Sequence, residues 1–164
     1  METKTVKQTA HPRKRELIIP KSTISEESQL RILMDAWANA LRSKDIEGIM
    51  RHYTPDVTVF GITPPLWYMG ARAHRQHWQE MFASFDGRIG YDFSDINITM
   101  GDKIAFCHCL NRISGKTKNG ETSATWLRVT VCYRKVDGRW MVSHEHVSVP
   151  FDTSSGKASV DLEP

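Results

Sequence analysis

The pattern of apolar positions changes along the chain from a helical period to a strand period. Near the start, apolar residues recur three and four positions apart and so lie on one side of a helix; they are Leu30, Leu33, Met34, Trp37 and Leu41. Ser25 precedes this run and is followed by Glu26 and Glu27, a hydroxyl cap with acidic residues in the first turn. A helix is therefore predicted to begin after Ser25.

Two further helices are predicted before residue 86. One covers residues 45–53 and ends before Thr54-Pro55, because proline disfavours helical geometry in the residue that precedes it. The other covers residues 71–85, where apolar residues again follow a helical period, and Asp86-Gly87 terminates it.

The rest of the chain has the alternating pattern of β-strands, with turn residues between them. Strands are predicted over residues 57–60, 66–69, 89–100, 103–114, 122–135 and 139–149. The last four are separated by turn signals at Gly101-Asp102, Asn119-Gly120 and Asp137-Gly138, which suit hairpins. Helices followed by an antiparallel meander predict an α+β domain, with the helices packed on one face of a strongly curved sheet.

Composition fits a single globular domain. The chain has 164 residues, of which 40% are hydrophobic, enough for a sizeable core. No apolar run approaches the ~20 residues that span a bilayer, and none resembles a secretory signal. We therefore expect a cytoplasmic protein with no membrane partner. The three cysteines lack the spacing of a zinc site and are expected to be buried free thiols.

Charge is concentrated at the start of the chain. The formal net charge is +3, but residues 1–23 hold six basic and two acidic residues, so the remainder carries −1. This segment also contains Pro12 and Pro20 and shows no sustained period. It is predicted to be a flexible basic arm ahead of a domain over residues 24–164. A basic run as short as Arg13-Lys-Arg15 does not predict nucleic-acid binding.

Polar side chains alternate with apolar ones in the final strand. Regular alternation places five residues on one face; they are Trp140, Val142, His144, His146 and Ser148. His144 is the candidate general base, since imidazole titrates near neutral pH, and Ser148 is a candidate hydrogen-bond donor. The alternative is that the imidazoles are bonded structurally to carboxylates or backbone. No carboxylate completes a metal site with these histidines and His108, so no metal is predicted.

Several segments together resemble the nuclear transport factor 2-like superfamily, and within it the ketosteroid-isomerase-homologue or SnoaL-like proteins. The resemblance covers residues from about 26 to 164. Its segments include Trp37-Ala-Asn-Ala-Leu-Arg-Ser-Lys-Asp-Ile-Glu-Gly-Ile49, Tyr53-Thr-Pro-Asp56, Arg134-Lys-Val-Asp-Gly-Arg-Trp140 and His144-Glu-His-Val-Ser-Val-Pro150. The resemblance implies a cone-like α+β fold that encloses a pocket, in a homodimer formed through the sheet.

Fold resemblance does not transfer chemistry, so the catalytic groups of steroid isomerases were sought at the matching positions. Those enzymes use a tyrosine, an aspartate base and a protonated aspartic acid. The matching positions hold Trp37, Gly61 and a residue near Thr130. The steroid-isomerase mechanism is therefore not predicted, and neither are the catalytic sets of the dehydratases and epoxide hydrolases of this fold.

Arg128 is the second candidate catalytic residue. Alternation places it on a strand face with Thr130, among apolar neighbours, where an unpaired charge would be costly. It is expected either to pair with Glu145 or Asp95, or to bind a carbonyl or anionic group of a ligand through its planar fork of donors.

These residues favour a small-molecule pocket protein that acts by general acid–base catalysis, as a lyase, isomerase or cyclase, on an apolar carbonyl compound. His144 and Arg128 are the predicted catalytic residues; the predicted ligand-binding residues are Trp67, Tyr68, Asn111, Thr130, His146 and Ser148. No cofactor is predicted. The alternative is a non-catalytic ligand-binding or oligomeric assembly module of the same fold. An open cavity of about 300 Å³ or more lined by His144, Arg128 and Asn111 would favour the first function.

Overall fold

The structure, a computed structural model, describes residues 24–164. The predicted basic arm, residues 1–23, lies outside the described residues. The elements in chain order are α1 (Glu26–Arg42), α2 (Ile46–Met50), β1 (Tyr53–Phe60), β2 (Tyr68–Met69), α3 (Ala71–Ser84), β3 (Phe85–Met100), β4 (Ile104–Thr117), β5 (Thr122–Val136), β6 (Arg139–Ser148), β7 (Phe151–Asp152) and β8 (Lys157–Ala158). Within the described residues, no helix is long and apolar enough to cross a membrane.

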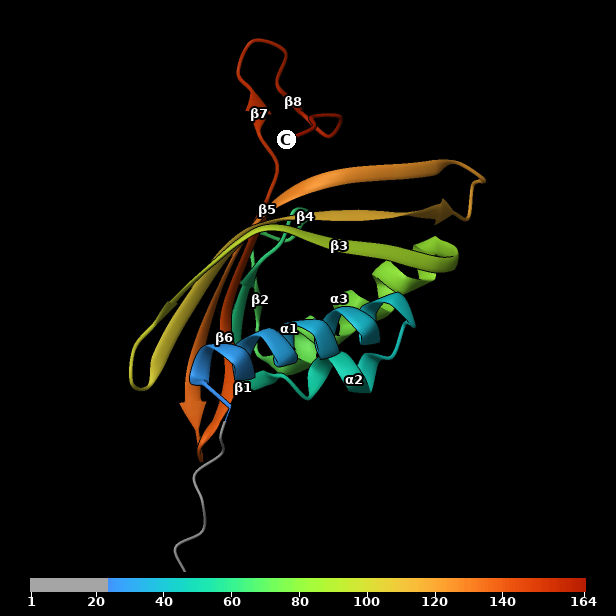
Figure 1. Ribbon diagram of the computed structural model, residues 1–164. Coiled ribbons are helices and arrows are strands. Elements are labelled where there is room, and N and C mark those ends of the chain that lie inside the picture. The colour runs from blue at the N-terminus through green and yellow to red at the C-terminus, as the bar shows by residue number, and fades with distance from the viewer. Residues whose placement is uncertain (1–23) are drawn as a thin grey trace, which may run out of the picture.

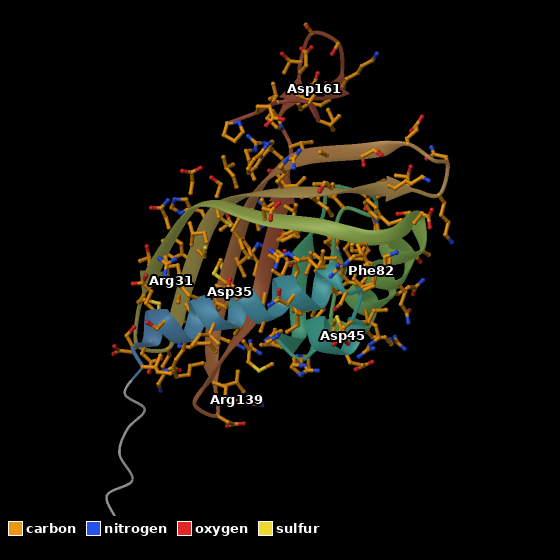
Figure 2. The ribbon with its side chains drawn as sticks, turned by 45° about the vertical axis from the view of Figure 1, so that its right-hand side comes forward. Arg31, Asp35, Asp45, Phe82, Arg139 and Asp161 are labelled. Atoms are coloured by element: carbon orange, nitrogen blue, oxygen red, sulfur yellow. The ribbon has the colours of Figure 1, made fainter. Side chains whose placement is uncertain are left out.

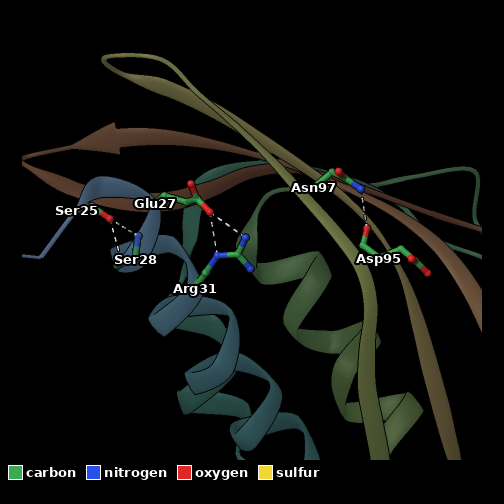
Figure 3. Close-up of polar contacts among 6 residues, drawn as sticks. All are labelled: Ser25, Glu27, Ser28, Arg31, Asp95 and Asn97. Carbon is green, nitrogen blue, oxygen red and sulfur yellow. Dashed lines mark hydrogen bonds and ion pairs between the residues drawn. The ribbon is translucent and has the colours of Figure 1, made fainter.

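Helix α1 begins where the sequence predicts. The Ser25 hydroxyl accepts a hydrogen bond from the Ser28 backbone N–H at 3.1 Å, which satisfies one of the free donors of the first turn (Figure 3). One turn later Arg31 donates to Glu27 at 2.8 Å on the exposed side of the helix. The opposite side of α1 is buried, as its apolar period predicts.

The six-stranded sheet has the order β2-β1-β6-β5-β4-β3 and is not closed into a barrel. Its neighbours are antiparallel except for β1 and β6, which run parallel. The long strands curve strongly, and α1 and α3 lie against the concave face with α2 packed against them, whereas the β7–β8 hairpin projects away from the helices (Figure 1). The predicted α+β class, with helices on one face of a curved antiparallel sheet, is confirmed.

The core fills the space between the helices and the concave face. Leu30, Leu41 and Ile49 are completely buried, and Trp78 and Phe82 of α3 contribute an aromatic pair 5.6 Å apart. Figure 2 shows side chains occupying this space between helices and sheet, with Phe82 on the α3 side. The core therefore supplies apolar walls for any cavity on this face of the sheet.

Several element boundaries differ from the sequence predictions, among them those of β1, α2 and β3. β1 begins at Tyr53 rather than residue 57, because a register shift between Tyr53 and Thr58 accommodates Pro55, which has no N–H to donate. Helix α2 ends at Met50, three residues before the predicted end, because the chain enters β1 at Tyr53. β3 begins at Phe85, directly after α3, so Asp86-Gly87 lies within the strand rather than in a terminating turn.

Two of the four register shifts in the sheet affect the shape and the interior face of its long strands. In β3 the pairing with β4 shifts between Ser94 and Asn97, and Asp95 there has a positive φ of 52°. The Asn97 side chain donates to the Asp95 carbonyl at 3.0 Å and holds this bulge (Figure 3). A bulge increases the local twist and bends the strand that contains it.

The second irregularity, in β6, changes which side chains face the helices. Val142 pairs with Tyr133 and His144 pairs with Cys132, so Ser143 is an extra residue. Beyond it the alternation is shifted by one position, and Glu145 is buried with only 6% of its surface exposed. The prediction that His144, His146 and Ser148 share a face with Trp140 and Val142 was therefore wrong.

Candidate functional site

Glu145 is the acidic side chain at the centre of the interior. Its Oε2 atom accepts a hydrogen bond of 2.8 Å from the Tyr53 hydroxyl. The Tyr53 oxygen in turn accepts a hydrogen bond of 3.1 Å from the indole N–H of Trp37. These residues come from β6, β1 and α1, so the packing of a helix on the sheet assembles a buried chain of hydrogen bonds that ends at a carboxylate.

Burial changes the acidity of this carboxylate. Desolvation disfavours the charged form and raises the pKa of Glu145 from 4.5 to about 7, and the hydrogen bond from Tyr53 limits the rise. Protonated and ionised forms are therefore both populated near neutral pH. A carboxyl group in that state is suited both to take and to return a proton.

His74 on α3 lies beside Glu145 but does not form an ion pair with it. Its Nε2 atom is 4.0 Å from Glu145 Oε2, but that nitrogen accepts a hydrogen bond of 2.9 Å from the Trp78 indole N–H and so carries no proton. Burial, assisted by nearby His77, lowers the pKa of His74 to about 3. The imidazole is therefore neutral, and its buried Nδ1 has no hydrogen-bond partner among the described residues.

Tyr91 presents a second polar group to the same space. Its hydroxyl oxygen accepts a hydrogen bond of 2.5 Å from the Asn111 side-chain amide, and the Asn111 oxygen accepts from the Cys109 thiol at 3.1 Å. Both Tyr91 and Asn111 are buried. No described side chain accepts the Tyr91 hydroxyl proton, so that O–H is a fixed donor available to a ligand.

Two neighbouring interior cavities share the walls formed by Trp37, Tyr91 and Glu145. The larger, called here the outer chamber, has a volume of about 120 Å³. Its other lining residues are Val59, Gly61, Ile62, Thr63, His74, His77, Trp78, Met81, Ile113, Leu127 and Val147. The smaller, the inner chamber, has about 30 Å³ and lies against Leu33 and Met34 of α1. Both are mainly apolar, so charge at Glu145 is enclosed by hydrocarbon and aromatic walls.

Four of the predicted site residues gather on the opposite, outer face of the sheet. Arg128, Thr130, His146 and Ser148 line an open hollow of about 410 Å³. The pairing Arg128↔Ser148 and Thr130↔His146 places them side by side on β5 and β6. Asp95 and His108 complete the rim, but Arg128 makes no ion pair with Asp95 or Glu145 within the described part of the chain. Its Nη2 donates to the Val149 carbonyl at 3.0 Å, and the side chain is exposed.

The other predicted site residues are dispersed. His144 Nδ1 lies 2.8 Å from the Thr58 carbonyl oxygen, and its ring contacts Phe60, which is the structural use of the imidazole considered above. Trp67 is half exposed, and the Tyr68 hydroxyl donates to the Pro64 carbonyl at 3.0 Å. Of the eight predicted residues only Asn111 lines an interior chamber. His144, Arg128 and Asn111 do not line a common cavity in the described part of the chain, because Asn111 is on the other face.

The interior site was missed by sequence reasoning, although one signal was present. Glu145 is the only charged residue among Met141, Ser143, Glu145, Val147 and Val149, an otherwise apolar or small alternate set. A lone carboxylate on such a face predicts a buried acid. Tyr53 was missed because residues 45–53 were assigned to a helix that ends before Pro55, whereas Tyr53 is the first residue of β1. No group of three or more residues able to hold a metal ion occurs in the part of the chain that the structure describes.

Comparison with known proteins identifies relatives of this arrangement. Residues 30–152 match the family model described as the SnoaL-like domain. An NTF2-like protein of unknown function from Pseudomonas putida is 33% identical, with a TM-score of 0.78, and the match covers 84% of this chain and 96% of that one. No curated protein sequence matches the chain.

More distant structures share the fold alone. A ketosteroid isomerase-like protein from Erwinia carotovora atroseptica is 18% identical, with a TM-score of 0.66, over 76% of this chain and 97% of that one. The association domain of C. elegans CaMKII is also 18% identical, with a TM-score of 0.60, over 76% of this chain and 95% of that one. The same architecture thus occurs in an isomerase-like protein and in an association domain.

Proposed function

The chain belongs to the SnoaL-like domain family of the nuclear transport factor 2-like superfamily, and on this basis we propose that its interior is a small-molecule site for general acid–base chemistry on an apolar carbonyl compound. The observation that carries the proposal is Glu145, a buried carboxylate whose pKa is raised to about 7, on the wall of an apolar cavity. A residue in a cavity whose pKa is strongly perturbed by desolvation is a candidate functional group.

Two groups divide the chemistry. The ionised Glu145 carboxylate takes a proton from the carbon next to the carbonyl, and the resulting enolate oxygen accepts a hydrogen bond from the Tyr91 O–H. The carboxylic acid then returns the proton to the same carbon or to another atom of the substrate. Tyr53 holds Oε2 by its hydrogen bond, which leaves Oε1 as the oxygen that acts. An isomerase, a lyase or a cyclase can all use this proton transfer.

The neutral imidazole of His74 has a supporting role. An imidazolium 4.0 Å from the carboxylate would stabilise the charged form of Glu145 and lower its pKa. Because the Trp78 N–H occupies Nε2 and burial keeps the ring uncharged, Glu145 retains a pKa near neutrality. The aromatic cluster around His74 therefore helps to keep the acid poised for proton transfer.

Hydrogen exchange at carbon tests the proposal without knowledge of the physiological substrate. Small cyclic and aryl ketones are incubated with the protein in heavy water, and loss of the α-hydrogen signal is followed by NMR. We expect the wild-type protein to accelerate exchange, and the outer-face variants His144→Gln and Arg128→Gln to keep the wild-type rate within about twofold. Loss of exchange in these two variants would show that the catalytic site is on the outer face. Absence of exchange and of ligand binding would favour the non-catalytic assembly module.

For the outer-face residues we propose contact with a second copy of the chain. The hollow that contains Arg128 and Asp95 adjoins exposed apolar side chains of the same face: Phe60, Ile104 and Phe106. A two-fold axis at the hollow brings Asp95 of one copy toward Arg128 of the other, an arrangement that is complementary to itself. Such a homodimer would bury the apolar side chains and would pair the charge of Arg128 with that of Asp95.

Light scattering during size-exclusion chromatography checks this dimer. We expect twice the chain mass for the wild-type protein at micromolar concentration and a monomer for Phe106→Asp, since a buried carboxylate at the contact has no partner. Ile32→Asp is the matched control, because Ile32 on α1 is also an exposed apolar residue, at 56% exposure against 41% for Phe106. A monomeric wild-type protein, or a dimer that Phe106→Asp leaves intact, contradicts the arrangement.

A further inference from the structure

Trp37 forms part of the wall that the two interior chambers share, together with Tyr91 and Glu145. Its indole lines both, and it is 93% buried, with a relative exposure of 7%. Three contacts fix its orientation: the N–H donates to the Tyr53 oxygen at 3.1 Å, and the ring meets Trp78 and Tyr91 edge to face at centroid distances of 5.6 and 5.2 Å. A side chain held on three sides does not move aside for a ligand at little cost.

The exposed residues in the lining of the outer chamber mark its mouth. Ile62 and Thr63, which line the chamber from the β1–β2 connection, are exposed, whereas Trp37, Tyr91 and Glu145 are buried. A ligand that enters beside Ile62 therefore reaches Glu145 and the indole face at the far end. The chamber volume of about 120 Å³ is slightly below that of an apolar cavity of ~150 Å³ that holds benzene.

The inner chamber, which Trp37 also lines, takes no part in the proton transfer described above. Apart from the polar groups near Glu145, its wall consists of hydrocarbon and aromatic side chains, among them Leu33, Phe93 and Val142. Its volume of about 30 Å³ would hold one small group. It shares the walls formed by Trp37, Tyr91 and Glu145 with the outer chamber.

We propose that Trp37 sets the size of the ligand. It forms part of the inner wall of the outer chamber, so the protein selects compact apolar carbonyl compounds no larger than about one small ring, and it excludes longer ones that would need the inner chamber. This inference rests on the proposed function for the carbonyl group, but the selection by length is a property of binding and does not require catalysis.

A series of methyl n-alkyl ketones, from 2-butanone upward, tests the inference by equilibrium binding, followed by intrinsic tryptophan fluorescence. In the wild-type protein, affinity should rise by up to about fourfold for each methylene group that is buried. It should then fall abruptly once the chamber is full. In Trp37→Leu the break should move to longer chains, and ketones beyond the wild-type break should bind at least tenfold more tightly than to the wild-type protein.

Leu33→Phe supplies the matched control, because Leu33 lines the inner chamber and not the outer one. In the Trp37→Leu background it should refill the opened space and return the break toward shorter chains. In the wild-type background it should leave the whole series unchanged, a result that stays informative if Trp37→Leu does not fold. Weaker binding to the Leu33→Phe single variant, or an unmoved break in folded Trp37→Leu, overturns the inference. A length-dependent break without hydrogen exchange overturns the proposed catalysis alone.

Discussion

The Glu145→Gln protein is expected to exchange the α-hydrogens of ketones at least about 100-fold more slowly than the wild-type protein, because positioned acid–base groups contribute 10²–10⁴-fold. Glutamine keeps the size of the side chain and can still accept the Tyr53 hydroxyl proton in a hydrogen bond. It has no basic oxygen that can take a proton from carbon. The measurement is the NMR exchange rate at saturating ketone, with ligand affinity determined in parallel to separate binding from catalysis.

The pH profile of the same reaction identifies the base. Exchange by the wild-type protein should rise with pH and level off above about 7, since only the ionised form of Glu145 accepts a proton and its pKa is about 7. In Tyr53→Phe the hydrogen bond that lowers this pKa is removed. The inflection should therefore move upward by about one pH unit, the equivalent of a hydrogen bond to a charged group. An unchanged inflection, or exchange within a few-fold of wild type in Glu145→Gln, excludes Glu145 as the base.

The second large effect concerns stability, because Glu145 and His74 impose opposite pH dependences on folding. Glu145 has a folded pKa of about 7, above its usual 4.5. The native state therefore binds more protons than the unfolded state between these values, and stability falls by about 3 kcal/mol as pH rises through them. His74 has a folded pKa of about 3, below its usual 6.5. Its burial uncharged makes stability rise by about 5 kcal/mol between pH 3 and 6.5.

The contributions of Glu145 and His74 to the free energy of unfolding cancel from pH 4.5 to 6.5. Variants that lack one of the two groups should therefore show the pH dependence of the other. Relative to wild type, the free energy of unfolding of Glu145→Gln should increase by about 3 kcal/mol from pH 4.5 to 7. That of His74→Gln should decrease by about 5 kcal/mol from pH 3 to 6.5. Urea titrations at half-unit pH intervals measure both, and differences from wild type remove the contributions of other groups. Parallel curves for wild type and both variants would show that neither group has a shifted pKa.

Local sequence determined most of the secondary structure. The cap at Ser25 and the apolar period of α1 placed that helix, and the Gly and Asn-Gly turn signals placed the hairpins, because these features act over a few residues. The predicted boundaries were wrong where pairing with a distant strand outweighed a local preference. Residues 45–53 were predicted to form a helix that ends before Pro55, but β1 begins at Tyr53 and continues through Pro55, where its register against β6 shifts.

The candidate site depended on one residue of register. With strict alternation in β6, His144 and His146 face the cavity and Glu145 faces away; with Ser143 as an extra residue, the order is reversed. A strand has a period of two, so a single bulge moves every later side chain to the other face. Nothing local to Trp140–Ser148 signals the bulge, because it arises from pairing with Tyr133 and Cys132, residues of another strand.

The sequence by itself determined the family, the α+β class and the presence of a strand with several titratable side chains, since composition, period and turn chemistry are encoded over short stretches. Only the tertiary structure decided which of those side chains is an acid in the interior. The pKa of Glu145 depends on its removal from water by Trp37, Tyr53 and Tyr91, which come from three other elements. Desolvation is a property of the space around a group, and that space exists only once the helices have packed against the curved sheet.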